Sequence, residues 1–350
     1  MTKNDLRKIV IVNTINDVPS NRQYFLLSQK LLEKGFEVIY ITDNSKVIAD
    51  YKGRIEYWKS KNFFKSFLFF VSIILKEKKF DSVILNFRAT NFSFLFYFFS
   101  RKVIVISQSD FFPNNFFSKI KSSLKFLFAH EVVTISNYMK EKLVSKFYFI
   151  PKNKISVFHN SIEVKKFESS FSKPTVENFK LDFSTTKRLV FVGNLEYHKG
   201  FDLLMTSFIK YNSKKIQLKI IGDGQLKSII PLNNENIIYL GRLSHQKVIE
   251  EMAQNHFIIL PSRKEAFGQV IIEAMTVGAV PLIAKNIGAS ELIHNFQSGF
   301  LFDDVSEALD FIDKMSFEQY LKLNGNVTIH KNNFDSTHWV NQYYEFIANY

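Results

Sequence analysis

Cysteine is absent from all 350 residues of the chain. This absence excludes disulfides, iron–sulfur clusters and thiol catalysis, and it fits a reducing cytoplasm. Long hydrophobic runs are absent too. The longest, FFKSFLFFVSIIL and NFSFLFYFFS, are too short or too interrupted to cross a bilayer, which needs about 20 apolar residues. The opening MTKNDLRKIVIVN runs directly into a short strand, so we expect no signal peptide.

Sequence patterns that mark other catalytic classes are also missing. His, Cys and Asp residues do not occur at metal-ligand spacings and there is no D-x-D pair, so we expect chemistry without a metal. The chain has no G-x-S-x-G, no P-loop G-x-x-x-x-G-K-[ST] and no G-x-G-x-x-G after a strand. These absences argue against a serine hydrolase, a kinase-like NTPase and a dehydrogenase.

Positive charge is unevenly distributed along the chain. The net charge is +13, but residues 1–180 carry 30 Lys and Arg against 15 Asp and Glu, which leaves the remainder at −2. A basic half indicates a surface that meets anions, such as an anionic bilayer, a lipid-linked diphosphate, an acidic polysaccharide or nucleic acid. The alternative is compositional drift, since 39 Phe with abundant Lys and Asn is also what an A/T-rich genome encodes.

Hydrophobic runs alternate with amphipathic segments in two series, which predicts an α/β protein with two doubly wound domains. The expected domains are residues 1–165 and 185–335, joined by a linker at 166–184 that contains Pro174. A helix after Ser136, with that residue as its N-cap, is expected in the first domain. The predicted strands are RKIVIVN, EVIYIT, DSVILNF, KVIVIS and ISVFHNS in the first series, and RLVFVGNL, QLKIIGDG, NIIYLG, HFIILP and VPLIA in the second.

The most informative run is PSRKEAFGQVIIEAMTVGAVPLI at residues 261–283. The apolar residues before it predict a buried strand, QVIIEAMTVG predicts a helix that ends at Gly278, and VPLIA predicts the next strand. A loop between a parallel strand and a helix N-terminus is where open α/β sheets bind phosphorylated ligands. Glu265 is expected in that loop and Glu273 about one turn into the helix. Two acids so placed can hold opposite ends of one polar ligand.

This run resembles the nucleotide-sugar signature of retaining glycosyltransferases of family four, P-S-x-x-E-x-F-G-x-x-x-x-E-A-M-x-x-G-x-P-V-I. The resemblance implies the GT-B fold, in which two Rossmann-like domains face each other across a cleft. It implies that residues 1–165 bind the acceptor and residues 185–335 the nucleotide sugar. The tail FDSTHWVNQYYEFIANY resembles the closing helix of the family, so residues 336–350 are expected to pack on the first domain.

Three further segments resemble the family pattern. FVGNLEYHKG at 191–200 resembles G-R-L-x-x-x-K-G, with Asn194 at the usual arginine. The missing cation would then come from a neighbour such as Arg188 or His198. IIGDG at 220–224 resembles a strand-to-turn segment, and LGRLSHQKV at 240–248 resembles the segment that lines the nucleobase pocket.

The resemblance implies a transfer of sugar from a nucleotide-diphosphate sugar to a hydroxyl of a glycan or a lipid-linked acceptor. A UDP-sugar is favoured, with a GDP-sugar as the alternative, and no metal or other cofactor is expected. Glu265 would bind sugar hydroxyls and Lys199 would stabilise the departing phosphate, while Glu273 would hold the ribose. The backbone of Ala266, Phe267 and Gly268 would contact sugar and phosphate. The remaining expected donor contacts are Gly193, Asn194, Gly222, Arg242 and Leu243.

The first domain departs from the family pattern. Its first loop, NTINDVPSNRQ, has no glycine, and the usual strand-end H-D is Ser109-Asp110, where Asp110 is the expected catalytic residue. Phe87-Arg88 stands where a histidine-bearing loop is common. These departures leave the acceptor open. They also leave open an inactive nucleotide-sugar-binding relative or partner subunit.

The expected place of action is the cytoplasm, with peripheral contact to the inner face of the cytoplasmic membrane in polysaccharide synthesis. The basic first half and the aromatic helix near residues 63–75 motivate the membrane contact. A nucleic-acid-binding protein is the other alternative that the pI of 9.5 raises. Because the charge lacks the Arg and aromatic interleaving of a known nucleic-acid module, no nucleic-acid partner is expected.

Overall fold

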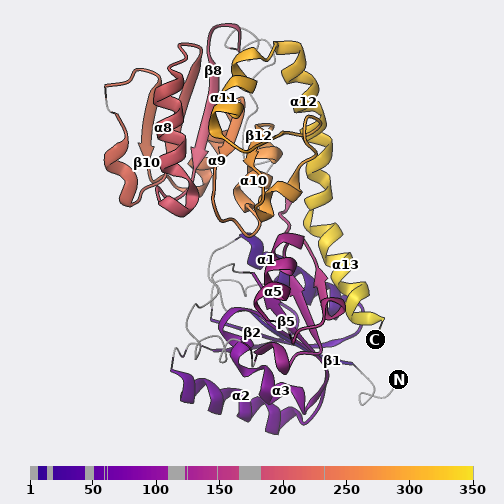
Figure 1. Cartoon of the computed structure of the whole chain (residues 1–350). Coiled ribbons are helices and arrows are strands. Elements are labelled where there is room, and N and C mark those ends of the chain that lie inside the picture. The colour runs from indigo at the N-terminus through magenta and orange to yellow at the C-terminus, as the bar shows by residue number, and fades with distance from the viewer. Residues whose placement is uncertain are drawn as a thin grey trace. The chain divides into compact units, whose positions relative to one another are not determined.

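A computed structural model describes residues 7–13, 19–43, 51–58, 60, 62–108, 123, 125–147, 149–164, 183–231 and 233–349 (Figure 1). The chain forms two compact units. Unit 1 comprises Met1–Ser161 with Ser336–Tyr350, and unit 2 comprises Ile162–Asp335. Most of the expected linker at 166–184 lies outside the described residues. No helix in the described part of the chain is both long enough and apolar enough to span a membrane.

Unit 1 is a parallel sheet of seven strands in the order β3-β2-β1-β4-β5-β6-β7. Alternate residues of β1 enter two different hydrophobic clusters, because successive side chains in a strand point to opposite faces. The strands are β1 (Lys8–Val12), β2 (Glu37–Thr42), β3 (Arg54–Tyr57), β4 (Phe80–Leu85), β5 (Ser100–Ser107), β6 (Glu131–Thr134) and β7 (Ile155–Val157). The helices are α1 (Pro19–Glu33), α2 (Phe63–Glu77), η2 (Phe87–Phe92), α3 (Ser93–Tyr97), α5 (Asn137–Lys146), η3 (Lys152–Lys154) and α13 (Ser336–Ala348).

The closing helix α13 packs on the first domain, as the resemblance implies, and its contact there is with α1. Trp339 and Tyr343 are buried, and their rings lie 5.2 Å and 6.2 Å from that of Tyr24 on α1. The aromatic stripe of the tail is therefore core. The predicted N-cap is confirmed as well, because the Ser136 hydroxyl accepts a hydrogen bond from the Met139 N–H at 3.2 Å.

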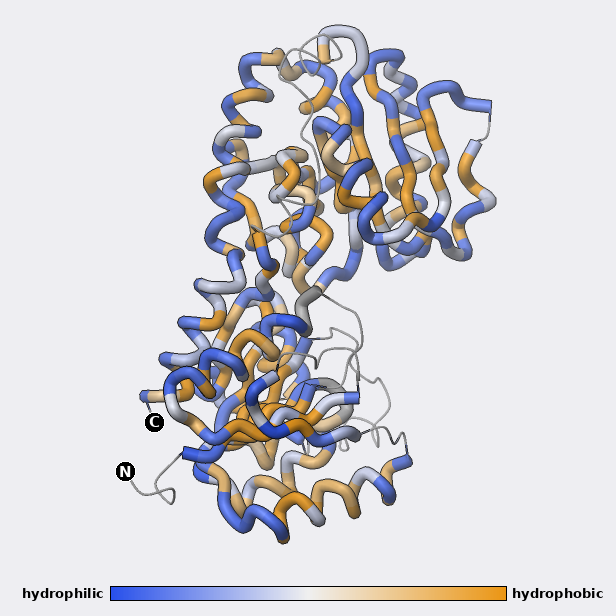
Figure 2. Tube along the Cα trace, turned by 180° about the vertical axis from the view of Figure 1, so that it is seen from behind, coloured by the Kyte–Doolittle hydropathy of each residue, from blue (hydrophilic) through white to orange (hydrophobic). Residues whose placement is uncertain are grey.

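Unit 2 is a parallel sheet of six strands in the order β10-β9-β8-β11-β12-β13. Figure 2 shows hydrophobic residues along the strands of both units. The strands are β8 (Lys187–Val192), β9 (Ile216–Ile221), β10 (Ile237–Gly241), β11 (Phe257–Leu260), β12 (Val280–Ala284) and β13 (Phe300–Phe302). The helices are η4 (Tyr197–Lys199), α8 (Phe201–Tyr211), η5 (Gln225–Ile229), α9 (His245–Ala253), α10 (Gln269–Val277), η6 (Gly288–Leu292), α11 (Val305–Lys314), α12 (Phe317–His330) and η7 (Lys331–Phe334).

The order of the six strands fixes where a ligand can bind to unit 2. The chain starts at β8 in the middle, moves outward through β9 and β10, and then returns to β11 on the other side of β8. The strand order therefore reverses between β8 and β11. In open α/β sheets, the crevice outside the carboxyl ends of the strands at such a reversal is the usual ligand site.

Candidate active site

The loops after β8 and β11 lie side by side at the reversal point. β8 and β11 pair in parallel, with Leu189 opposite Phe257 and Val190 opposite Ile258. The loop after β8 carries Gly193 and Lys199, and the loop after β11 carries Glu265. Residues more than sixty positions apart in the sequence therefore reach the same edge of the sheet.

Gly200 permits an unusually close approach of these two loops. Its φ is +66°, and a Cβ at this position would lie 1.9 Å from the Pro261 carbonyl oxygen. Two further backbone bonds join the loops, because the His198 carbonyl accepts from the N–H groups of Arg263 at 2.9 Å and Lys264 at 3.3 Å. Any larger residue at position 200 would separate Lys199 from the β11 loop.

Lys199 and Glu265 form an ion pair across the two loops. The distance from Lys199 Nζ to Glu265 Oε2 is 2.6 Å. The side chains keep 25% and 16% of their exposure, so both remain within reach of a ligand. The Glu265 backbone is held separately, since its carbonyl accepts from the Gly288 N–H at 2.7 Å. The structure thus brings together the two residues that the resemblance assigns to phosphate and sugar.

Arg263 clamps the β8 loop beside this pair. Its guanidinium donates two hydrogen bonds to the Asp202 carboxylate, at 2.6 and 2.7 Å, and a third to the Tyr197 carbonyl at 2.6 Å. The same group lies 3.7 Å from the centre of the Tyr197 ring. The Arg263 hydrogen bonds hold the pKa of Asp202 below its ordinary value. Sequence reasoning missed this clamp, and the one available signal was a basic residue two positions before Glu265.

The loop after β11 turns into α10 at Gly268. This residue has φ of +81°, and a Cβ there would lie 2.7 Å from the Ala289 Cβ, so both conformation and space favour glycine. The Phe267 side chain is buried, which leaves its backbone as the part that can face a ligand. The amino end of α10 carries the partial positive charge of a helix N-terminus, which suits a phosphate.

Glu273 lies in the second turn of α10 and is nearly buried, at 7% exposure. Its Oε1 lies 3.4 Å from His245 Nε2 at the start of α9, and this hydrogen bond raises the pKa of His245. α9 follows the Gly241-Arg242-Leu243 segment, in which Arg242 is exposed and Leu243 is half-buried. Glu273 is therefore next to the segment that the resemblance assigns to the nucleobase. His245 is a neighbour that sequence reasoning missed.

Glycines join the loops after β8, β9 and β10. A Cβ at Gly222 would lie 1.8 Å from the Gly193 carbonyl oxygen, and the Gly222 N–H donates to the Gly241 carbonyl at 2.8 Å. The exposed Asn194 precedes Leu195, whose N–H donates to the Asp223 carbonyl at 3.0 Å. The loops that carry Gly193, Asn194, Gly222 and Arg242 therefore lie next to one another at the carboxyl ends of β8, β9 and β10.

The expectation that Arg188 supplies the cation missing at Asn194 is wrong. Arg188 is the second residue of β8, so it lies at the amino end of the strand, about 13 Å along the strand from the loop that carries Lys199. His198 does lie in that loop, with Nδ1 at 3.2 Å from Glu196 Oε2.

The predicted site residues of the first domain are not among the described residues. Asp110 and Ser109 lie outside the described residues, as does the Arg88 side chain. Among the residues that are described, no three His, Asp or Glu side chains gather in a way that could hold a metal ion, and metal-free chemistry stays a prediction.

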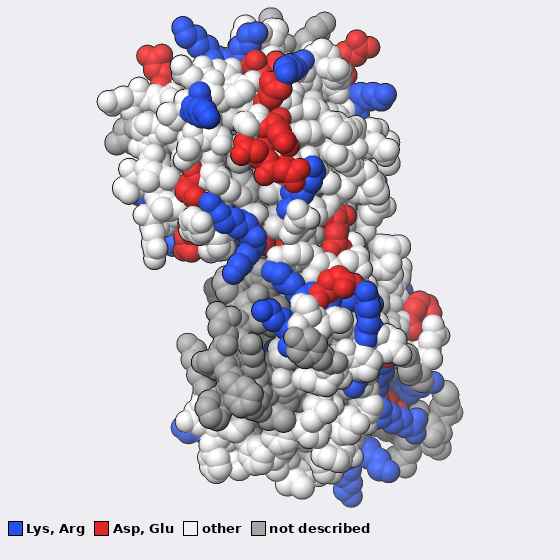
Figure 3. All heavy atoms as spheres, in the orientation of Figure 1, with Lys and Arg blue, Asp and Glu red and all other residues white. Residues whose placement is uncertain are grey.

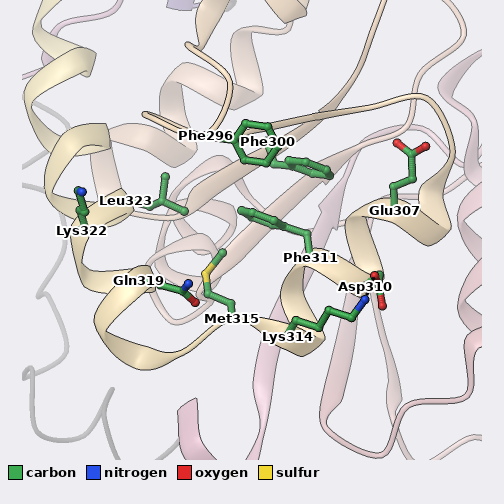
Figure 4. Close-up of a pocket in the computed structure, with 10 residues that line it drawn as sticks. All are labelled: Phe296, Phe300, Glu307, Asp310, Phe311, Lys314, Met315, Gln319, Lys322 and Leu323. Carbon is green, nitrogen blue, oxygen red and sulfur yellow. Dashed lines mark hydrogen bonds and ion pairs between the residues drawn. The ribbon is translucent and has the colours of Figure 1, made fainter.

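A separate cavity of about 600 Å³ lies elsewhere in unit 2 (Figure 4). Its floor includes the stacked rings of Phe300 and Phe311, 4.3 Å apart, and its rim includes Lys314 and Asp310. Phe300 begins β13 and Lys314 ends α11, so the cavity opens at the amino end of the strands. It is therefore on the opposite edge of the sheet from the Lys199–Glu265 pair.

Comparison with known proteins finds a family match for each of the two units. Residues 173–318 match the family described as Glycosyl transferases group 1, and residues 20–166 match Glycosyltransferase Family 4. The two matches fall on unit 2 and unit 1 respectively, and together they cover most of the chain.

Solved structures of similar fold span nearly the whole chain. A glycosyltransferase from Rickettsia africae has a TM-score of 0.76 at 18% identity, and covers 99% of this chain and 98% of its own. HepE of Anabaena, in complex with UDP and glucose, has a TM-score of 0.73 at 15% identity, with 98% and 100% covered.

Curated relatives match over a shorter stretch. The capsular polysaccharide biosynthesis glycosyltransferase CapM of Staphylococcus aureus is 25% identical over 213 residues, which is 58% of this chain and 52% of CapM. The chain spans about half the length of the curated relatives it matches. The solved structures share the fold of this chain, and from the two family matches the chain belongs to glycosyltransferase family 4, the glycosyl transferases group 1.

Proposed function

We propose that the chain transfers a sugar from a nucleotide-diphosphate sugar to a hydroxyl group of a glycan or lipid-linked acceptor, with retention at the anomeric carbon. The observation that carries the proposal is the Lys199–Glu265 pair at the reversal point of the unit 2 sheet. A UDP-sugar is the favoured donor, with a GDP-sugar as the alternative. The HepE complex with UDP and glucose supports this choice by fold likeness, and CapM supports a role in cell-surface polysaccharide synthesis.

Lys199 supplies the positive charge at the diphosphate. Its ammonium is paired with the Glu265 carboxylate at 2.6 Å. A bound diphosphate competes for that ammonium, which frees the Glu265 carboxylate to accept hydrogen bonds from sugar hydroxyls. The pair then separates into one group for each half of the donor.

The chemical step breaks the bond between the anomeric carbon and the phosphate oxygen, and forms a bond to the acceptor oxygen on the same face. The departing phosphate oxygen takes the acceptor proton. Negative charge builds on that oxygen and positive charge on the ring, so Lys199 and Glu265 stabilise opposite charges that develop together. The N-terminus of α10 adds a partial positive charge near the phosphate.

Glu273 binds the ribose hydroxyls in this proposal. Its burial and its contact with His245 fix the carboxylate before the nucleotide arrives, which lowers the ordering cost of binding. Arg242 and Leu243 contact the base. Asp110 acts on the acceptor side, and its role rests on the resemblance alone.

The test is a thermal-shift screen of the full chain against UDP-, GDP- and ADP-sugars, followed by donor hydrolysis. A ligand at 100 times its Kd stabilises the folded state by about 2.7 kcal/mol, which raises Tm by several degrees. A shift with hydrolysis supports the proposal. A shift without hydrolysis, in the wild type and in Glu265→Gln alike, identifies an inactive relative or partner subunit. No shift with any nucleotide sugar, together with steeply salt-dependent DNA binding, identifies a nucleic-acid-binding protein.

A further inference from the structure

Helix α2 exposes a stripe of apolar side chains. Phe64, Leu68 and Leu75 are 65%, 50% and 73% exposed, and their spacing of four and seven places them on one face of the helix. The opposite face is buried in unit 1 through Phe70, Ile73 and Ile74. An exposed apolar face on a helix whose other face is already buried is typical of a surface that contacts a membrane or another protein.

The stripe continues onto α3 and the turns around it. The rings of Phe67 and Phe94 stack at 6.5 Å, and Phe128 lies 6.4 Å from Phe94 and 6.3 Å from Phe98. Phe98 is 74% exposed. Figures 1 and 2 show α2 along one outer edge of unit 1 with hydrophobic residues along its length. We call this region the α2–α3 surface; its exposed members are Phe63, Phe64, Leu68, Leu75, Phe98, Phe99 and Leu127.

The charges around the α2–α3 surface are basic. Lys65, Lys76, Lys78 and Lys79 are all exposed on or just after α2. The one acidic residue of α2 is Glu77, and its carboxylate is turned to Lys8 at 2.6 Å and to Arg54, with 8% of its side chain exposed. In Figure 3 the lower end of unit 1, where α2 lies in Figure 1, is mostly uncharged, with Lys and Arg along its rim.

We propose that the α2–α3 surface docks on an anionic lipid bilayer, with α2 lying in the plane of the interface. Apolar side chains then enter the boundary between headgroups and acyl chains, while the lysines meet anionic headgroups. A second copy of the chain is a poorer occupant, because a symmetric contact would set the basic rims of the two copies against each other. The purpose of this docking rests on the proposed function, because it would bring the enzyme to lipid-linked acceptors.

Co-sedimentation with vesicles tests the docking. The full chain is mixed with vesicles of phosphatidylcholine alone or with added phosphatidylglycerol. We expect binding that requires phosphatidylglycerol and weakens as salt is raised. The variant Phe64→Ser/Leu68→Ser/Leu75→Ser should bind at least about a hundredfold more weakly, since each buried apolar side chain contributes on the order of tenfold. Lys65→Glu/Lys76→Glu/Lys79→Glu should also lose binding to the vesicles that contain phosphatidylglycerol, because the charge that meets the anionic headgroups is reversed.

A matched control uses exposed apolar residues of unit 2. Ile209, Leu321 and Ile329 are 45%, 41% and 72% exposed, and their triple serine variant should bind vesicles as the wild type does. Failure of the wild type to bind anionic vesicles at low salt would overturn the proposal. So would a wild-type dimer that the α2 variant converts to a monomer. A UDP-glucose thermal shift measured on the same α2 variant checks its folding and reports separately on the proposed function.

Discussion

Substitutions in the Lys199–Glu265 pair are predicted to lower catalytic activity much more than folding stability. Lys199→Ala and Glu265→Gln each remove one member of a pair with 2.6 Å between Nζ and Oε2. Both side chains are partly exposed, so the pair contributes only about 0.2–1 kcal/mol to folding. Removing a group aimed at charge that develops in the transition state costs on the order of 10²–10³ in rate, or about 2.7–4 kcal/mol. Activity should therefore fall far more than stability.

The assay measures donor hydrolysis and urea unfolding on the same preparations. Lys219→Ala is the matched control, because Lys219 and Glu251 form an ion pair of unit 2 with the same geometry, 2.7 Å apart with 14% and 24% exposure. We expect the control to lose a similar amount of stability and to keep its turnover. The double variant Lys199→Ala/Glu265→Gln should lose less than the product of the two single losses, since the two groups act on one transition state.

Two results would refute this reasoning. The first is a Glu265→Gln enzyme that hydrolyses donor at the wild-type rate. The second is a Lys219→Ala enzyme that loses as much turnover as Lys199→Ala, because the effect would then belong to any ion pair of unit 2.

Two further predictions concern the groups around the pair. Gly200→Ala should lower the free energy of unfolding by at least about 2 kcal/mol, because a Cβ in this left-handed conformation would lie 1.9 Å from the Pro261 oxygen. The control Gly325→Ala, in α12 with open space around its Cβ, should raise the free energy of unfolding by about 0.5–1 kcal/mol. Equal urea midpoints for the two variants would contradict this prediction. His245→Asn should lower Tm most below about pH 6.5, because the Glu273 hydrogen bond raises the folded pKa of His245 above its ordinary value and so stabilises the protonated form. That difference should shrink as pH rises through the folded pKa, and a Tm difference that grows with pH would have the wrong sign.

The segment at 256–284 could be predicted closely because the signals that mark the ends of its strands and its helix are local. HFIILP, QVIIEAMTVG and VPLIA became β11, α10 and β12, and Gly278 ends α10 with φ of +94°. Each boundary depends on a glycine or on an unbroken apolar run, and a single window of sequence contains both.

Short strands and long-range pairs could not be predicted in the same way. β3, with the sequence RIEY, and β6, with EVVT, have too few apolar residues to stand out, and their parallel neighbours stabilise them. The expected strand ISVFHNS is shorter, and ends at Val157 as β7. The Arg263–Asp202 clamp joins residues 61 positions apart, and nothing in either segment indicates the other.

The position of α13 has a consequence for how the protein is made. Unit 1 needs Trp339 and Tyr343 to complete the core around Tyr24, yet these residues leave the ribosome after all of unit 2. During translation the first unit lacks the part of its core that α13 adds beside α1, while the second unit can already fold. Loss of the last fifteen residues would then destabilise the first unit and leave the second intact. A premature stop codon near the 3′ end of the message would therefore destabilise the N-terminal unit of the protein.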